Sequence, residues 1–136
     1  LVGLIKNKKP ENALILGSGG ASKAVKYVLN KLNINFSTVS RKSGKSEFIY
    51  ENLNNGIINS FKLIINCSPV GTYPNTNDSP NIPYECLTED HILYDLIYNP
   101  TETLFLKKGR KSGCKIKNGL EMLEVQANEA WIIWNS

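Results

Sequence analysis

Hydrophobic and polar residues alternate along this chain in two recurring patterns. Short runs in which nearly every residue is apolar, such as residues 13–16 and 63–67, are typical of strands buried on both faces of a sheet. Between these runs, apolar residues recur at three- and four-residue spacing, which places them on one face of a helix. Because strands that alternate with helices form a parallel sheet covered on both sides, the pattern predicts an α/β domain.

The ends of these elements follow from where the apolar pattern meets glycine, proline and asparagine. The predicted strands are residues 13–16, 36–39, 63–67, 92–98 and 114–117. The predicted helices are residues 21–32, a segment from Thr101 or Thr103 to about Lys111, and a last segment from about Leu120. Residues 46–61 form a weaker unit, and the four prolines of residues 68–83 predict a long loop. The buried face of the first helix is predicted to consist of Ala21, Val25, Val28, Leu29 and Leu32.

A glycine-rich turn, GSGGAS at residues 17–22, joins the first strand to the first helix. In a dinucleotide-binding fold the first glycine makes the tight turn, the second lets the backbone approach a pyrophosphate, and a small third residue lets the helix pack on the strand. Gly17, Gly19 and Ser22 occupy these places, and we expect the phosphates on free N–H groups at residues 20–22. The location between a strand and an amphipathic helix favours a nucleotide site over a purely structural turn.

The end of the second predicted strand indicates which nucleotide the site prefers. Residues 39–45 have the sequence VSRKSGK, and no carboxylate follows until Glu47. An NAD site uses an Asp or Glu here to accept hydrogen bonds from the ribose, whereas an arginine can bind a 2′-phosphate. Arg41, with Lys42 or Lys45 adding positive charge, therefore favours NADP. A solvated basic loop is the alternative for these residues taken alone.

Composition argues against several other classes of protein. The formal net charge of +4 is mild and the basic residues are not clustered with aromatic ones, so we expect no nucleic acid partner. No stretch reaches the ~20 apolar residues of a membrane span. The scattered cysteines and the single histidine, His91, match no metal-site spacing, so no metal is expected. Cys67 and Cys114 lie in apolar runs, and buried thiols suit a reducing, cytoplasmic location.

Several segments resemble one enzyme family. IINCSPVGTYP (64–74), YDLIYNPTETLFL (94–106) and NGLEMLEVQANEAWIIW (118–134) are similar to the INATPxGM, xDxxYxPxxTxxL and xGxxMLxxQAxxxFxxW segments of shikimate dehydrogenases. GSGGAS and SRKSGK are similar to the same family's GAGGAS and NRTxxR, and all the segments occur in the family's order. Ser40, Lys42 and Lys45 depart from the family's asparagine, threonine and arginine.

The resemblance implies a Rossmann-like, doubly wound, mostly parallel sheet with helices on both faces and a site for NADP. The implied activity is that of shikimate 5-dehydrogenase, the NADPH-dependent reversible reduction of 3-dehydroshikimate to shikimate in chorismate and aromatic amino acid biosynthesis. Tyr98 and Gln126 match family positions that face the substrate. The cofactor-binding residues that the resemblance implies are Gly17, Ser18, Gly19, Gly20, Ala21, Ser40, Arg41, Lys42, Lys45, Ser68, Val70, Leu96 and Gly119.

The resemblance also implies that this chain holds only part of the enzyme. The family's catalytic Lys–Asp pair belongs to an N-terminal domain, and the first three residues, LVG, look like the end of the family's NTDxxG segment. We therefore expect residues 1–12 to end a linker helix from a missing N-terminal domain, and residues 13–136 to form the NADP-binding domain. No residue of this chain is assigned as catalytic, and the chain alone is expected to be inactive.

Three further expectations concern assembly and alternative functions. Apolar surface left by the missing domain could drive formation of a homodimer. Within the enzyme class, the alternative is a quinate/shikimate dehydrogenase that uses NAD. Outside it, the alternative is a nucleotide-sensing module that uses the same site without catalysis.

Overall fold

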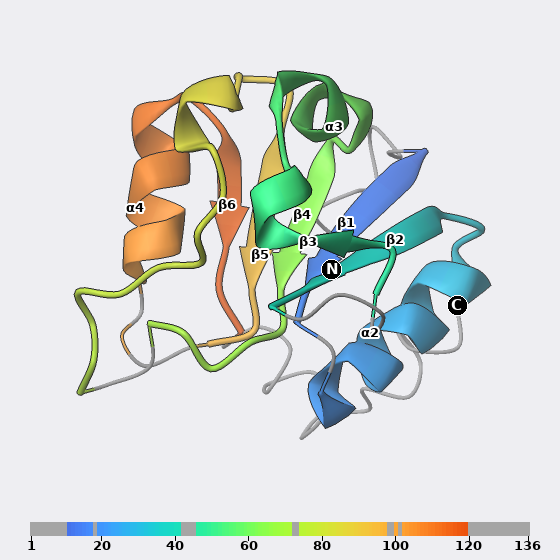
Figure 1. Ribbon diagram of the computed structural model, residues 1–136. Coiled ribbons are helices and arrows are strands. Elements are labelled where there is room, and N and C mark those ends of the chain that lie inside the picture. The colour runs from blue at the N-terminus through green and yellow to red at the C-terminus, as the bar shows by residue number, and fades with distance from the viewer. Residues whose placement is uncertain are drawn as a thin grey trace.

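The computed structural model describes residues 11–17, 19–41, 46–71, 74–97, 100 and 102–119. The strands in these ranges are β1 (Asn12–Leu16), β2 (Asn35–Ser40), β3 (Phe48–Ile49), β4 (Leu63–Asn66), β5 (Ile92–Asp95) and β6 (Lys115–Lys117). They form one six-stranded sheet in the order β3-β2-β1-β4-β5-β6, and every neighbouring pair is parallel (Figure 1). This Rossmann-like order confirms the predicted fold class.

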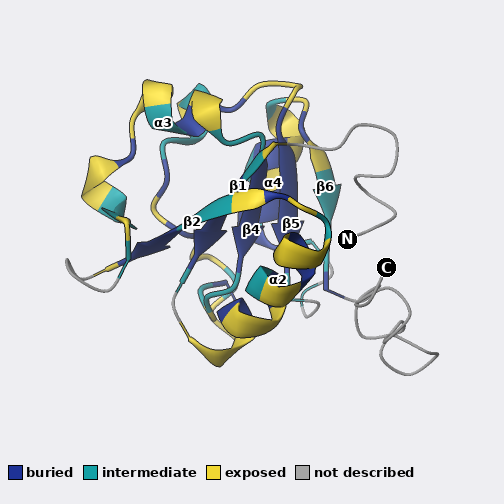
Figure 2. Ribbon diagram, turned by 90° about the vertical axis from the view of Figure 1, so that its right-hand side faces the viewer, coloured by how far each residue is buried: buried dark blue, intermediate teal, exposed yellow. Residues whose placement is uncertain are grey.

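Helices cover both faces of the sheet, as the sequence pattern predicts. The described helices are α2 (Gly20–Lys31), α3 (Asn55–Ser60) and α4 (Leu104–Lys111), with short 3-10 helices η1 (Tyr50–Asn52) and η2 (Tyr84–Cys86). α2 packs on one face, and the others lie on the opposite face (Figures 1 and 2). The weaker unit predicted for residues 46–61 is thus a two-residue strand followed by η1 and α3.

Two hydrophobic clusters form the core, one on each face of the sheet. Because successive strand residues point to opposite faces, Ala13 and Ile15 pack with α2, whereas Leu14 and Leu16 pack with α3 and α4. All four side chains are fully buried. This confirms that the first strand is covered on both sides (Figure 2).

The buried face of α2 differs at its start from the predicted face. Val25, Val28 and Leu29 are buried as predicted, but Ala21 is exposed and the predicted face was wrong there. Ser22 is buried in its place, and its hydroxyl donates a 2.6 Å hydrogen bond to the carbonyl of Gly19. The first helical turn therefore presents a small residue to the sheet, as helix packing close to the strand requires.

β5 is shorter than the predicted strand 92–98, because it ends at Asp95. The carboxylate of Asp95 accepts a 3.0 Å hydrogen bond from the N–H of Ile97, which turns the backbone away from the sheet. Cys67 and Cys114 lie just outside β4 and β6, where Cys67 is half-buried and Cys114 is buried. The end of β5 is therefore set by the polar side chain of Asp95 as well as by the apolar pattern of the sequence.

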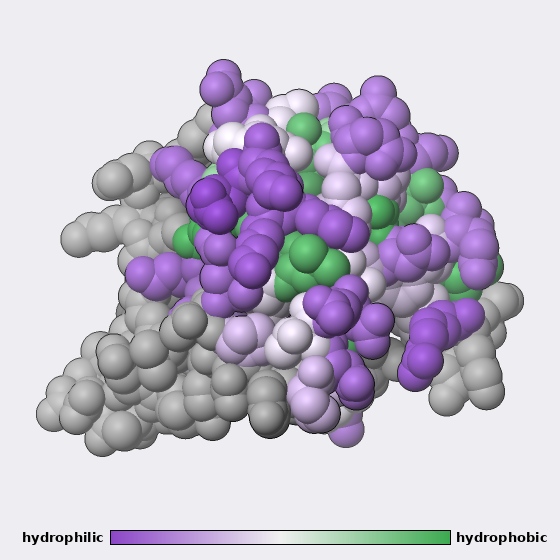
Figure 3. Space-filling model, turned by 90° about the vertical axis from the view of Figure 1, so that its left-hand side faces the viewer, coloured by the Kyte–Doolittle hydropathy of each residue, from purple (hydrophilic) through white to green (hydrophobic). Residues whose placement is uncertain are grey.

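The outward side of α4 is strongly polar, as Figure 3 shows for that face of the molecule. Lys107, Arg110 and Lys111 are exposed, whereas Phe105 and Leu106 are buried against the sheet. Glu102 receives a bidentate pair of hydrogen bonds from Arg110, at 2.9 and 3.2 Å. This basic side is an ordinary solvated helix face.

Candidate functional site

A pocket of about 420 Å³ opens at the carboxyl edge of the sheet, where β1 lies between β2 and β4. The chain leaves β1 toward β2 and β3 and returns to β4 on the other side, so this is the switch point of the fold, where open α/β sheets bind ligands. The residues that line this switch-point pocket are Gly17, Ser40, Arg41, Tyr50, Glu51, Ser68, Val70, Ser79, Pro80 and Asn81. Five of them, Gly17, Ser40, Arg41, Ser68 and Val70, are predicted cofactor residues.

Gly17 makes the tight turn that brings the end of β1 against the chain after β4. Its φ is +103°, a region that L side chains rarely adopt. A Cβ at this position would lie 3.1 Å from the backbone nitrogen of Ser68, so only glycine fits. The N–H of Gly17 donates to the carbonyl of Val39 at 2.8 Å, which ties the turn to the end of β2.

The start of α2 is left open toward solvent. Gly19 is the N-cap residue and so supplies no side-chain cap, and the first turn carries no acidic residue. A Cβ on Gly19 or Gly20 would meet no atom within 4 Å. Of the predicted residues 20–22, Ser22 does not offer a free N–H, because it donates to the carbonyl of Gly19 at 3.1 Å. The N–H groups of Gly20 and Ala21, the positive end of the helix dipole and the open space together suit a bound phosphate. The residues present therefore fit the pyrophosphate of a dinucleotide cofactor.

Arg41 follows β2 directly and is exposed at the rim of the switch-point pocket. Burial raises the pKa of the neighbouring Tyr50 hydroxyl, and the positive charge of Arg41 opposes part of that rise. Among the described residues, Arg41 forms no ion pair. Its guanidinium is therefore available to a ligand anion.

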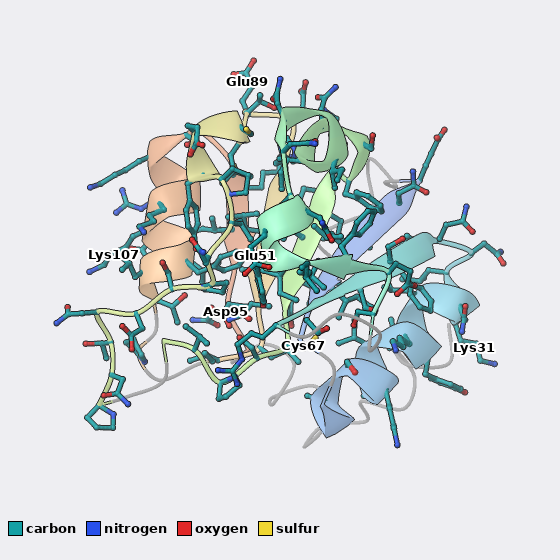
Figure 4. All side chains as sticks on the ribbon, viewed as in Figure 1. Lys31, Glu51, Cys67, Glu89, Asp95 and Lys107 are labelled. Carbon is teal, nitrogen blue, oxygen red and sulfur yellow. The ribbon has the colours of Figure 1, made fainter. Side chains whose placement is uncertain are left out.

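Glu51 and its neighbour Tyr50 line the pocket but were not predicted from the sequence. Glu51 lies in η1, which follows the very short strand β3, and it lines the same pocket as Arg41. Figure 4 labels Glu51 beside β3. In the sequence, Glu47 is the first carboxylate after β2, but its side chain accepts a 2.6 Å hydrogen bond from Thr38 Oγ1. That bond is the main reason why the pKa of Glu47 is lowered. Glu51 could have been predicted from the end of a third strand at the same edge of the sheet, but that strand, β3, has only two residues and leaves no clear pattern in the sequence.

The far wall of the pocket, Ser79 to Asn81, was also missed, because it comes from the middle of the long loop. Tyr84 donates a 2.6 Å hydrogen bond from its hydroxyl to the carbonyl of Pro80. Lys108 donates to Ser79 Oγ at 3.1 Å, and its ammonium lies 4.5 Å from the centre of the Tyr84 ring. Contacts from η2 and α4 therefore hold this wall in place.

A buried polar network lies beside the pocket, at the ends of β4 and β5. Asn66, Asp95 and Thr103 are each 0% exposed. Asp95 accepts hydrogen bonds from Asn66 Nδ2 at 3.2 Å and from Thr103 Oγ1 at 2.7 Å. Asn66 Oδ1 in turn accepts from the N–H and hydroxyl of Ser68, at 3.1 and 2.6 Å. The Ser68 wall of the pocket is thus fixed by a chain of hydrogen bonds that ends at Asp95.

Burial raises the pKa of the Asp95 carboxyl to about 6, although hydrogen bonds from Thr103, Ile97 and Asn66 act in the opposite direction. Asp95 is labelled in Figure 4 at the same, lower end of the sheet as Cys67, and Glu89 lies at the opposite end. Burial is also the main cause that raises the pKa of the Cys67 thiol to about 12. A thiol with such a pKa is protonated at neutral pH, so Cys67 is a packing residue rather than a nucleophile.

The structure brings Leu96 and Gly119 together close to this network, although neither lines the pocket. Leu96 N–H donates to the carbonyl of Asn66 at 3.1 Å, and Gly119 N–H donates to that of Ile97 at 3.2 Å. A Cβ on Gly119 would collide with the carbonyl of Leu96, so the two backbones touch. Gly19, Gly20 and Ala21 likewise lie outside the pocket lining, at the start of α2. The predicted site residues Ser18, Lys42, Lys45, Tyr98 and Gln126 lie outside the described residues.

In the part of the chain that the structure describes, no three His, Cys, Asp or Glu side chains are grouped closely enough to hold a metal ion. No helix within the same residues is long and apolar enough to cross a membrane.

Fold and pocket together define the class: a Rossmann-like α/β domain with a cleft at its switch point whose glycine turn fits a dinucleotide pyrophosphate. Comparison with known proteins shows which proteins the chain is related to. The chain is a homologue of the shikimate dehydrogenases, and it spans about half the length of the curated relatives it matches. No protein-family model matches the chain.

Three similar proteins illustrate this relationship. Shikimate dehydrogenase (NADP(+)) from Methanococcus maripaludis is 39% identical over 146 residues, which cover 97% of this chain and 51% of the relative. The crystal structure of a shikimate dehydrogenase in complex with NADP+ is 30% identical with a TM-score of 0.77, covering 98% of this chain and 53% of that one. The Thermus thermophilus enzyme in complex with NADP(H) and shikimate is 27% identical with a TM-score of 0.74, covering 90% and 48%.

Proposed function

We propose that this chain is the NADP-binding domain of a shikimate dehydrogenase, which reduces 3-dehydroshikimate to shikimate reversibly with NADPH. The observation that supports it most is the switch-point pocket, which brings together the Gly17 turn and Arg41, a residue without an ion pair among the described residues, next to the open start of α2. The curated relatives cited above are named as NADP(+) enzymes, and one similar structure was crystallised with NADP+. Bound NADPH would supply the hydride, and the chain's task is to hold and orient it.

Each part of the pocket has a role in this proposal. N–H groups at the start of α2 bind the pyrophosphate, as at other helix N-termini. Arg41 pairs with the 2′-phosphate of NADP or stacks on its adenine, with Ser40 beside it. The backbone from Ser68 to Val70 contacts the cofactor on the β4 side. Leu96 and Gly119 lie further along the same edge, where the nicotinamide half would reach.

We assign no catalytic residue to this chain. The proton-transfer groups are proposed to come from an N-terminal domain, to which residues 1–12 would lead. Tyr98 and Gln126 remain the predicted substrate-facing residues on this side of the cleft. A homodimer remains a prediction as well.

NAD is the second candidate cofactor, and Glu51 is the observation that favours it. A carboxylate near the adenosine ribose accepts hydrogen bonds from its hydroxyls and repels a 2′-phosphate. Because Arg41 and Glu51 line the same pocket, the preference between the two cofactors depends on both charges.

Cofactor binding is tested by titrating the chain with NADPH and with NADH while following their fluorescence. We expect tighter binding of NADPH, and we expect Arg41→Gln to weaken NADPH about tenfold with little effect on NADH, because one charge-assisted contact to the 2′-phosphate is lost. Lys31→Gln is the matched control, since it removes the same charge at the other end of α2 (Figure 4). Binding of NADH as tight as that of NADPH would contradict the proposed NADP preference.

The dehydrogenase function is tested by joining the chain to the N-terminal half of the Methanococcus maripaludis relative. We expect this fusion to oxidise NADPH when 3-dehydroshikimate is added. A fusion that folds and binds NADPH without turnover would instead support the nucleotide-sensing module.

A further inference from the structure

Asp95 ends β5, which lies on the other side of the switch point from β2 and Arg41. A Rossmann-like sheet is built from two mononucleotide-binding halves, and the dinucleotide crosses the switch point between them. Gly17 and Arg41 belong to the β1–β2 half. With the adenosine on that side, the nicotinamide falls over the ends of β4 and β5, where Asn66 and Asp95 end their strands.

The hydrogen bonds of Asp95 connect it to the pocket wall and to the turn after β5. Oδ1 accepts from Asn66 Nδ2 and from the N–H of Ile97, and Oδ2 accepts from Thr103 Oγ1. Asn66 carries the connection onward to Ser68, which lines the pocket. Two successive hydrogen bonds therefore separate the Asp95 carboxyl from the pocket surface.

Within the described part of the chain, no cationic side chain neutralises the negative charge of Asp95. Among the described residues, no lysine, arginine or histidine forms an ion pair with it. The groups that donate hydrogen bonds to Asp95, from Asn66, Ile97 and Thr103, are neutral. Thr103 is also the N-cap of α4, whose dipole is positive at that end. The carboxylate also acts at a distance, because it contributes to the raised pKa values of Cys67 and Tyr84 on either side.

Such an uncompensated buried carboxylate distinguishes the two redox states of a nicotinamide cofactor. The oxidised ring carries a positive charge and the reduced ring is neutral, so a negative charge nearby stabilises the oxidised form preferentially. We propose that Asp95 is a positioning residue whose carboxylate favours binding of the oxidised over the reduced cofactor. This inference rests on the proposed function, because it requires a nicotinamide dinucleotide in the pocket.

The test compares the Kd of NADP+ with the Kd of NADPH for the chain and for Asp95→Asn. NADPH is titrated by its fluorescence, and NADP+ by competition with NADPH, at about pH 8, where the carboxyl is ionised because its pKa is about 6. Asparagine keeps the shape and the acceptor for Asn66 and Ile97 but removes the charge. We expect the ratio of Kd(NADP+) to Kd(NADPH) to rise about three- to tenfold in the variant, as one charge acting across a partly polar site allows.

Glu89→Gln is the matched control, because Glu89 is exposed at the opposite end of the sheet (Figure 4). We expect its ratio to equal that of the unchanged chain. A purely structural role of Asp95 would weaken both redox forms equally and leave the ratio unchanged, which would overturn the inference. If Asp95→Asn does not fold, Asp95→Ser takes its place, since serine removes the same charge and can still accept a hydrogen bond from Ile97.

Failure of the proposed function has a different signature in this experiment. If the unchanged chain binds neither NADPH nor NADP+, both the cofactor assignment and the role of Asp95 are wrong. If the unchanged chain binds both and the ratio does not respond to Asp95→Asn, only the role of Asp95 is wrong.

Discussion

Two turns at the same edge of the sheet each lead from a strand into a helix, and the two helix starts are capped differently. After β1, Gly17 turns the chain into α2, whose first N–H groups have no side-chain cap and face open space. After β5, the chain leads into α4, where Thr103 Oγ1 accepts from the N–H of Leu106 at 3.3 Å and donates to Asp95. One helix start is satisfied within the protein, and the other is left for a ligand.

The difference between these two helix starts explains why the β1 turn, rather than the β5 turn, offers a binding site. Both turns follow buried parallel strands, so the topology alone would permit an anion at either. At the β5 turn the side chain of Thr103 caps α4, and its hydroxyl donates to Asp95. At the β1 turn the absence of side chains on Gly19 and Gly20 keeps the position that an anion would take empty of protein atoms.

The pH dependence of stability is the strongest test of the β5 turn. The folded-state pKa of Asp95 is raised from 3.8 to about 6. Between these values the folded state holds a proton that the unfolded state releases, so the contribution of Asp95 to stability is present at low pH and is lost as pH rises toward about 6. Asp95→Asn has no such titration, and we expect its stability relative to the unchanged chain to rise by about 2 kcal/mol between about pH 4 and pH 7.

Urea unfolding of both proteins at several pH values within that range measures this difference. The comparison cancels the titration of other carboxyl groups, such as Glu47, whose pKa is lowered and whose effect has the opposite sign. Parallel pH profiles for the two proteins would show that Asp95 does not titrate in this range. The β5 turn would then not lower the unfolding free energy as the pH rises.

A pair of glycine substitutions separates folding from binding at the β1 turn. Gly17→Ala places a Cβ at φ +103° and against the backbone of Ser68, so we expect a loss of about 2 kcal/mol in unfolding free energy. Gly19→Ala meets open space at φ −77°, and we expect it to change stability by less than about 1 kcal/mol. Its methyl group enters the space reserved for phosphate, so NADPH binding should weaken instead.

Urea unfolding and NADPH titration of both variants check this expectation. Equal stability losses at Gly17 and Gly19 would mean that the turn is structural throughout. That result would remove the contrast with the β5 turn, since both helix starts would then serve only the fold.

Sequence alone predicted the β1 turn well because its signals are local. The apolar run of β1, the glycines and the amphipathic α2 are adjacent in the chain, and each follows from backbone sterics or helical spacing. At the β5 turn the sequence predicted the start of α4 at Thr101 or Thr103, and Thr103 is its N-cap. It did not predict the bond between Asn66 and Asp95, which are 29 residues apart. The apolar residues after Asp95 extended the predicted strand, whereas the carboxylate takes the N–H of Ile97 and ends it.

The same distinction explains the errors at the pocket. Ser40 and Arg41 follow a strand of clear pattern and were found, but Glu51 follows a strand of only two residues. Ala21 satisfied the helical spacing, yet it is exposed, and its neighbour Ser22 is the residue of the first turn that packs against the sheet. Spacing predicts which face a helix buries, and it does not say where along the helix the neighbouring sheet ends.

The smallest expected effect concerns the charges that face the open turn. Glu51→Gln removes the pocket carboxylate and leaves Arg41 as the charged side chain among the pocket residues. Repulsion between Glu51 and a 2′-phosphate is then lost, so we expect NADPH to bind about three- to fivefold more tightly while NADH binds equally or less tightly. Glu85→Gln, at an exposed position outside the pocket lining, is the matched control. Salt should diminish the gain, because exposed charges are screened. A Glu51→Gln variant with unchanged affinity for both cofactors would mean that the carboxylate points away from the adenosine ribose, and that Arg41 alone sets the preference at this turn.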